Sequence, residues 1–220
     1  AVFADMFYWT GSAWVYEGGS QTNNIINLTC GGITCNSTHL GTSSAAYFPP
    51  ARQGSISGTD RSGNFWIGFG VNSGPVYLDD LWKWDGSTWT YVDGHLTTSA
   101  YVSNWGTKGT YASSNAVGAH YNGLTSQKIL FDPVNNQPWM LGTYGYQGST
   151  YNFSDLWTWT MSGGRGYPVW KGGSSGYDQA SSYGAAGASG ASTYGYHVGA
   201  AFFLDKNGYP SSWGGYGGAA

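Results

Sequence analysis

Short apolar and aromatic runs, separated by turn residues, make up most of the chain. The run 81–84 is followed by Asp85-Gly86, and a second β-rich run covers 88–92. Glycine tolerates the positive φ angle that a tight hairpin turn requires, so this stretch predicts a β-hairpin. Further strands are predicted near 65–69, 139–142 and 156–160. The pattern predicts an all-β fold of short antiparallel strands.

An internal repeat is the strongest signal in the sequence. In three segments an Asp is followed four residues later by a Trp, and successive copies are 75 residues apart. Because the tryptophans recur at the repeat period, we expect them to pack between sheets rather than to stack on sugars. The repeat-defining positions are Asp5, Asp80, Asp155, Trp9, Trp84, Trp159, Trp14, Trp89, Trp66, Trp139, Gly70 and Gly145.

Two hairpins in series are predicted in each repeat, which gives four short strands. Four-stranded antiparallel units repeated around an axis form a β-propeller, usually of roughly 4–8 blades. The 220 residues supply about three blades, so we expect a single propeller domain or fragment over 1–220, part of a larger or multi-chain propeller. Its expected parts are a half-blade 1–19, a long loop 20–48, a blade 49–94, a loop 95–115, a blade 116–173, a Gly/Ser-rich loop 174–193 and a half-blade 194–220.

The copy from 49 to 94 carries a recognisable motif. Its residues are Pro49-Pro50-Ala51-Arg52, Asp60, Gly63-Asn64-Phe65-Trp66, Gly70, Asp80-Leu81-Trp82, Trp84-Asp85 and Trp89. This copy resembles a kelch repeat, and the galactose-oxidase-like central propeller is similar. The resemblance implies a β-propeller fold. A kelch repeat has about 50 residues, so we expect the surplus of each 75-residue repeat to lie in the connections between blades.

The resemblance does not carry a copper-oxidase activity over to this chain. That activity needs a Tyr–Cys pair and His ligands, whereas the only cysteines, Cys30 and Cys35, lie close together in a predicted loop. The Gly/Ser stretch 172–176 matches a nucleophile-elbow pattern, but such a tract matches by chance. Asp79-Asp80 suggests either a calcium site or, more often, a turn in which carboxylates bind backbone amides. We expect no enzyme activity and no cofactor or metal.

Composition excludes several classes of protein. The chain holds 37 Gly, 12 Trp, 18 Tyr and 9 Phe, and only 9% of its residues are charged. This composition is poor in helix-favouring residues, which excludes a helical bundle. The net charge of −3 without a basic cluster argues against a nucleic-acid partner. No apolar run approaches the roughly 20 residues of a membrane span.

Two cysteines and three sequons indicate the compartment. Cys30 and Cys35 suit either a short disulfide or part of a metal site, and scattered single histidines favour the disulfide. Asn27, Asn36 and Asn152 each begin an N-glycosylation sequon. Together these features predict a secreted, extracellular glycoprotein.

Three functions remain open at this stage. The first is an extracellular structural glycoprotein that self-associates as a component of a wall, sheath, hair or filament, without catalysis. The alternative is a secreted carbohydrate-binding or adhesive propeller module, and a weaker alternative is an oxidase-like propeller whose active site lies outside this chain. The terminal strands, at 3–9 and near 202–213, are expected to pair with other copies of the chain or with the rest of a longer one.

Overall fold

A computed structural model of the chain describes residues 1–23, 29–30, 33–74, 76–95, 101–121, 128–142, 144–146, 148–183, 185–186 and 194–217. The described part is all-β, with 21 strands and one short 3-10 helix, η1 (Ser37–His39). Its strands form several antiparallel sheets, none of which closes on itself. Within the same ranges, no helix has the length and apolar character needed to cross a bilayer.

Four consecutive strands form the first sheet, in the order β7-β8-β9-β10. They are β7 (Ile56–Thr59), β8 (Phe65–Gly68), β9 (Leu81–Trp84) and β10 (Trp89–Asp93). Each strand is antiparallel to the next, and the short strand β5 (Ser43–Ser44) adds to the outer side of β10. The predicted β-hairpin and the strand near 65–69 are therefore confirmed.

The second sheet repeats this arrangement in the order β12-β13-β16-β17. Its strands are β12 (Leu130–Phe131), β13 (Pro138–Leu141), β16 (Leu156–Ser162) and β17 (Arg165–Gly172). The strands predicted near 139–142 and 156–160 are confirmed. Both complete sheets thus consist of two hairpins in series.

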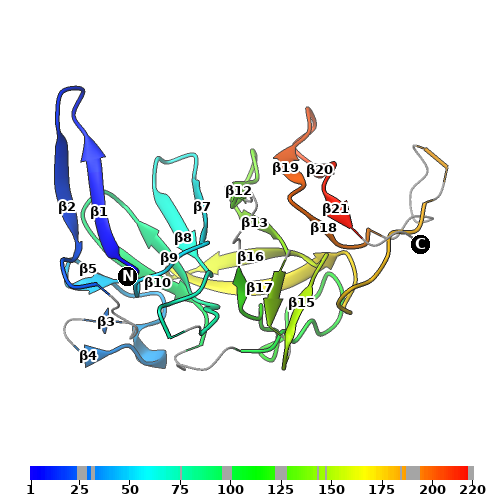
Figure 1. Cartoon of the computed structure of the whole chain (residues 1–220), viewed down its shortest axis with the longest axis horizontal. Coiled ribbons are helices and arrows are strands. Elements are labelled where there is room, and N and C mark those ends of the chain that lie inside the picture. The colour runs from blue at the N-terminus through cyan, green and yellow to red at the C-terminus, as the bar shows by residue number, and fades with distance from the viewer. Residues whose placement is uncertain are drawn as a thin grey trace.

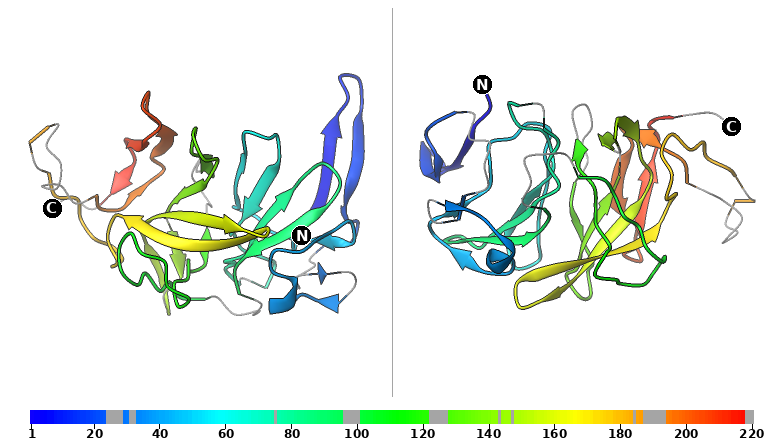
Figure 2. Two further views of the ribbon diagram at one scale, coloured as in Figure 1. Left: turned by 180° about the vertical axis from the view of Figure 1, so that it is seen from behind. Right: turned by 90° about the horizontal axis from the view of Figure 1, so that it is seen from below.

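Two isolated hairpins lie at opposite ends of the row of sheets (Figures 1 and 2). They are β1 (Ala4–Trp9) with β2 (Trp14–Ser20), and β19 (Ala201–Leu204) with β20 (Pro210–Trp213). By the repeat, β1–β2 corresponds to the second hairpin of a complete sheet and β19–β20 to the first. In the described part of the chain, β1 pairs only with β2 and β20 only with β19.

Three smaller sheets accompany the two complete ones in the described part of the chain. They comprise β3 (Thr29–Cys30), β4 (Ile33–Thr34) and β6 (Tyr47–Phe48); β11 (His120–Tyr121), β14 (Tyr144–Tyr146) and β15 (Thr150–Asn152); and β18 (His197–Val198) with β21 (Tyr216–Gly217). Strands β14 and β15 lie between β13 and β16, inside a repeat. The expectation that the surplus residues lie only between repeats is therefore wrong.

An apolar core joins the two complete sheets. Ile56 and Leu81 of the first sheet belong to one buried cluster with Met140 and Trp157 of the second. Burying one large apolar side chain stabilises the fold by about 1.5–3 kcal/mol. This shared core fixes the two sheets against each other, so they form one packed body.

An aspartate stabilises the turn of the first hairpin in each repeat. Asp60, Asp132 and Asp205 each accept two backbone N–H groups of their own turn, at 2.7–3.0 Å. In the first sheet the Trp66 indole also donates to the Asp60 carboxylate, at 2.9 Å. These bonds hold the turn without a partner strand, which is why the same turn recurs in the isolated β19–β20 hairpin.

The central ladder of each complete sheet begins with an equivalent bond. The Asp80 carbonyl accepts the N–H of Phe69 at 3.0 Å, and the Asp155 carbonyl accepts the N–H of Gly142 at 2.7 Å. Since Asp80 and Asp155 hold the same repeat position, Phe69 and Gly142 are structural equivalents. The register of one sheet can therefore be carried over to the other residue by residue.

This register corrects one predicted equivalence. Gly70 follows Phe69 directly, whereas Gly145 lies three residues after Gly142, so the two glycines do not occupy equivalent positions. Gly70 is instead needed for its own backbone: its φ is +92°, and a Cβ there would lie 2.7 Å from the carbonyl oxygen of Gln53. The 75-residue spacing of the two glycines is a coincidence of loop lengths.

Candidate functional site

The Asp80 carboxylate is buried and fully engaged. Arg52 donates two hydrogen bonds to it, at 2.9 and 2.6 Å, and the Trp82 indole donates a third at 2.7 Å. Arg52 also donates to the Phe69 carbonyl at 3.0 Å. A bidentate guanidinium–carboxylate pair is among the stronger polar contacts in proteins. It ties the segment before β7 to the start of β9.

Asp155 holds the same position in the second sheet with different partners. Its Oδ2 accepts the indole N–H groups of Trp157 at 2.7 Å and Trp105 at 2.9 Å. His120 Nε2 lies 3.5 Å from the other carboxylate oxygen, and both side chains are fully buried. His120 Nδ1 lies 2.7 Å from the carbonyl oxygen of Gly118. Histidine and two indoles thus replace the arginine and single indole of the first sheet.

These contacts differ from the turn predicted for Asp79-Asp80. Asp80 binds side chains from distant segments, and Asp79 Oδ2 lies 2.6 Å from His95 Nδ1 while also accepting the His95 backbone N–H at 3.2 Å. No three metal-binding side chains come together among the residues that the structure describes. The aspartate pair therefore organises strands rather than a turn.

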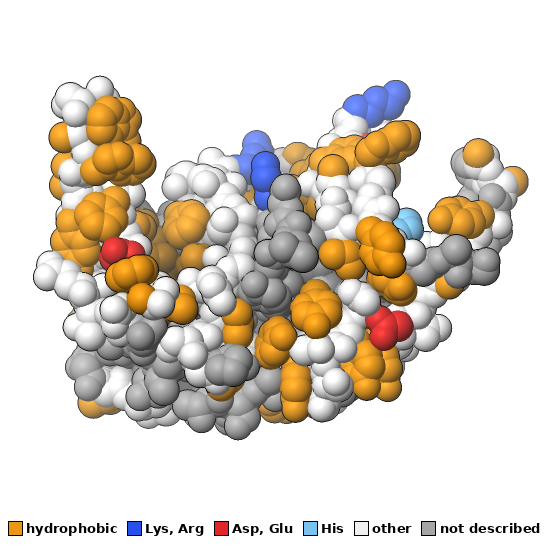
Figure 3. Space-filling model, in the orientation of Figure 1, with side chains coloured by type: hydrophobic (Ala, Val, Ile, Leu, Met, Phe, Trp, Pro, Cys, Tyr) orange, Lys and Arg blue, Asp and Glu red, His pale blue; other side chains and the backbone are white. Residues whose placement is uncertain are grey.

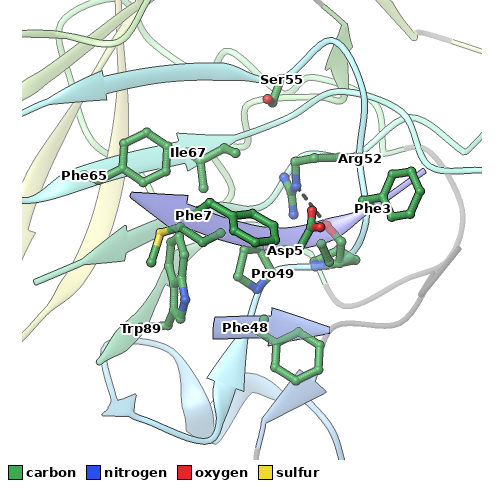
Figure 4. A pocket seen from close by; sticks show the side chains of 14 residues that line it. Phe3, Asp5, Phe7, Phe48, Pro49, Arg52, Ser55, Phe65, Ile67 and Trp89 are labelled. Carbon is green, nitrogen blue, oxygen red and sulfur yellow. Dashed lines mark hydrogen bonds between the residues drawn. The ribbon is translucent and has the colours of Figure 1, made fainter. Parts of the chain in front are cut away.

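Asp5, the third repeat aspartate, is exposed. It lines a groove of about 320 Å³ between the β1–β2 hairpin and the first sheet, and Figure 4 shows its side chain beside that of Arg52. Phe7, Phe65 and Trp89 line the apolar part of the groove. The residue two positions after Asp5 is Phe7, so the indole donor of the complete sheets is missing here.

The β1–β2 hairpin presents aromatic side chains to solvent. Phe7 is 49% exposed, whereas Trp82 and Trp157 at the same repeat position are 0% exposed. The Trp9 and Trp14 rings contact each other, with centroids 5.6 Å apart, and both are more than half exposed. Figure 3 shows these hydrophobic side chains along the upright hairpin at the left of the molecule. The expectation that these two tryptophans are core residues is wrong for the described chain.

The other repeat tryptophans lie inside the sheets. Trp84 and Trp89 face each other across β9 and β10, with centroids 5.4 Å apart, and Trp66 is buried. Trp159 is buried and donates to Asp93 at 2.6 Å. The Trp139 indole nitrogen is buried without a hydrogen-bond partner in the described structure. Packing between sheets therefore accounts for most of the repeat aromatics.

A second cavity, of about 220 Å³, lies between the first sheet and the start of β17. It is lined by Asp93, His95, Tyr111, Asn115, Arg165 and Tyr167, among others. Burial raises the pKa of Asp93 to about 6, although the Trp159 hydrogen bond favours its charged form. Burial also raises the pKa of Asp79, despite the neighbouring His95. The cavity combines hydroxyl, amide and charged groups with aromatic rings.

The structure places the predicted disulfide and two of the three sequons. Cys30 and Cys35 form a disulfide, which confirms the predicted bridge. Asn36 is exposed and uses its side-chain oxygen to cap η1. The Asn152 side-chain nitrogen donates to Asp178 at 2.8 Å. Asn27 lies outside the described residues.

Sequence reasoning missed the partners of the repeat aspartates. Arg52, His120 and Trp105 lie 28, 35 and 50 residues before the carboxylates they approach. The one available signal was that Arg52 ends the Pro-Pro-Ala-Arg stretch of the kelch-like motif. The partner is Arg in one repeat and His in the next, so no residue type recurs at this position in the sequence.

Replacing Asp80 should destabilise the fold strongly. We expect Asp80→Ala to lower the free energy of unfolding by about 3–5 kcal/mol, because Arg52 would stay buried without its partner. Urea unfolding followed by tryptophan fluorescence measures the loss. The matched control is Asp5→Ala in dilute protein: the same repeat position is exposed there, so the change should stay within about 0.5 kcal/mol. Equal losses would contradict the assignment of Asp80 as a buried anchor.

Asp93 should make stability fall as the pH rises. Its folded-state pKa of about 6 exceeds the ordinary 3.8, so the folded chain holds this proton more tightly. The stabilisation is present below pH 4 and is lost between about pH 4 and 6.

Asp93→Asn should therefore remove up to about 3 kcal/mol of the decrease in unfolding free energy between pH 4 and 8. Denaturant unfolding at both pH values measures it. Asp85→Asn serves as control, because the lowered Asp85 pKa of about 2 lies outside this window. An unchanged pH slope in Asp93→Asn would exclude Asp93 as the titrating group.

The sequence and structure were compared with known protein families, curated proteins and solved structures. No family model, no curated protein and no solved structure matches the chain.

Proposed function

We propose that the chain is a non-catalytic extracellular structural glycoprotein module that self-associates through its open strand edges. The sheets would act as kelch-like propeller blades, and the assembly would serve as a component of a wall, sheath, hair or filament. The observation that carries this proposal is the exposed aromatic edge at β1, whose counterparts in the two complete sheets are buried.

An open β edge favours association. The described part of β1 lacks a partner on the side away from β2, so backbone donors and acceptors are available there. β1 also contains no lysine or proline, the residues that commonly protect an edge strand. Strand addition by another chain would satisfy the backbone groups and cover Phe7, Tyr8 and Trp9.

A secreted location is part of this proposal and is supported by two features. The disulfide between Cys30 and Cys35 is typical of oxidising compartments, and the Asn36 sequon lies on an exposed segment. Peptide mass mapping of native material should find the two cysteines bridged and a glycan at Asn36. Free thiols together with an unmodified Asn36 would contradict the extracellular assignment.

A charged edge residue should block the association. We expect Phe7→Lys to raise the concentration needed for assembly at least about tenfold, since assembly would bury the new charge. Light scattering against protein concentration measures this. Val134→Lys is the control, because Val134 is exposed in the turn between β12 and β13 and belongs to neither β1 nor β20. Equal assembly of the two variants, with normal circular dichroism spectra, would contradict the role of β1.

Carbohydrate binding is the second candidate function. The cavity that holds Asp93, His95 and Tyr167 offers both hydrogen-bonding groups and an aromatic ring, which is the chemistry that binds sugars. A glycan array with wild-type protein and with Tyr167→Ala tests it. A glycan retained by wild type and lost in the variant would favour this function over a purely structural one.

A further inference from the structure

An arrangement of side chains that binds an aspartate occurs three times, and the residues that the structure describes supply the aspartate in two of them. The Gly118 N–H donates to Ser103 Oγ at 3.0 Å, just before His120. The Gly195 N–H donates to Ser181 Oγ at 3.1 Å, just before His197. The two histidines also pair with equivalent glycines across their small sheets. His197 is therefore the structural counterpart of His120.

The same match locates a counterpart for Trp105. The Ala119 N–H donates to the Tyr101 carbonyl, and the Tyr196 N–H donates to the Gln179 carbonyl. Tyr101 lies two residues before Ser103, just as Gln179 lies two residues before Ser181. Trp105 lies two residues after its serine, and Tyr183 lies two residues after the other. Trp105 donates to Asp155, whereas Tyr183 is 80% exposed.

Resting on the self-association proposed above, we propose that Asp5 of a second copy occupies the position beside His197 that corresponds to that of Asp155, with Tyr183 in the place of Trp105. In the second sheet the equivalent place is taken by Asp155, which belongs to β16 and faces His120 and Trp105. After β20 no described strand supplies that aspartate. Strand β1 of a second copy carries it at the matching repeat position.

The register of this contact follows from the two complete sheets. Phe69 and Gly142 donate to the carbonyls of the repeat aspartates, and Gly214 holds their position after β20. The Gly214 N–H should therefore donate to the Asp5 carbonyl of the second copy. The remaining pairs are Trp213 with Met6, Ser212 with Phe7, Ser211 with Tyr8 and Pro210 with Trp9.

Side-chain size and burial suit these pairs. The small Ser211 and Ser212 lie opposite the large Tyr8 and Phe7, which leaves room for the aromatic rings. Trp213 is 79% exposed, whereas Leu141 at the same position in the second sheet is 5% exposed. Pairing with Met6 would cover the Trp213 ring in the same way that Leu156 faces Leu141.

The contact joins two different surfaces of the chain. The β19–β20 hairpin of one copy and the β1–β2 hairpin of the next complete one four-stranded sheet, in the order β19-β20-β1-β2. Such a head-to-tail contact closes into a ring or continues as a filament, depending on the rotation between copies. In a ring, each chain pairs its β20 with β1 of the next copy, and the same holds for the inner chains of a filament.

Cysteine cross-linking tests the register. A Tyr8→Cys chain is mixed with a Ser211→Cys chain under mild oxidation, with assembly monitored by light scattering. In the complete sheets the equivalent pairs, Trp66 with Lys83 and Trp139 with Thr158, are direct cross-strand neighbours. We expect a covalent dimer linked at these two positions, since directly opposite Cα atoms lie within disulfide range.

The control shifts the register by one residue. Tyr8→Cys mixed with Ser212→Cys should cross-link at least about tenfold less, because the new thiol points to the other face of the sheet. Equal cross-linking of both mixtures, or assembly without any cross-link, overturns this inference and leaves the proposed self-association standing. Wild-type protein that stays monomeric at all concentrations overturns both.

A double-mutant cycle tests the acid site itself. Asp5→Ala should weaken association at least about tenfold, while Glu17→Ala, which removes an exposed acid from the neighbouring strand β2, should change it less than twofold. His197→Ala should weaken association in wild type but have little further effect in Asp5→Ala, since the two side chains act as a pair. Additive effects would show that Asp5 and His197 do not meet.

Discussion

A buried carboxylate at the start of the third strand is the constraint on which each complete sheet depends. Asp80 and Asp155 are removed from water, so each needs donors that replace its lost hydration. One donor is the indole two residues further along the strand, and another comes from a segment at least 28 residues earlier. A single side chain thus holds the approach to the first strand against the third. The apolar core between the sheets packs on strands that this side chain helps to hold in register.

Sequence predicted the fold wherever the signal is local. The Asp85-Gly86 turn and the alternating aromatics around it gave the β9–β10 hairpin, because a tight turn and its flanking strands lie within about ten residues. The 75-residue period extended this to β16. It failed for Gly70 and Gly145, since inserted strands β14 and β15 changed the loop length while the spacing happened to agree. A repeat measured in residues is reliable only between positions that share a hydrogen-bond partner.

The residues that contact the repeat aspartates could not be predicted, because equivalent positions hold different residue types and only the folded structure brings them to the carboxylate. Arg52 and His120 each directly precede a residue whose strand partner lies two positions after the equivalent Phe69 and Gly142, and His197 corresponds to His120. One structural position thus holds two residue types, and Trp105 corresponds to Tyr183. The burial of aromatics shows the same limit. Trp84 and Trp9 are equivalent in sequence, yet a neighbouring strand covers the first and is missing beside the second in the described structure. The residue type shows that a side chain is suitable for burial, but the neighbouring strands determine whether it is buried.

Open edges that match each other raise the question of what selects one register among several. Backbone hydrogen bonds alone do not, because a strand shifted by two residues recovers them all and keeps its faces. Aromatic contacts discriminate weakly, since Phe7 and Trp9 point to the same face and are both large. A charged side chain discriminates strongly, because it loses its hydration in every register but is compensated in only one. Asp5 is the one Asp, Glu, Lys or Arg residue of β1. In the two complete sheets the corresponding aspartate meets its donors in one alignment of strands, so the same side chain that anchors a sheet within a chain is suited to fix the register between chains.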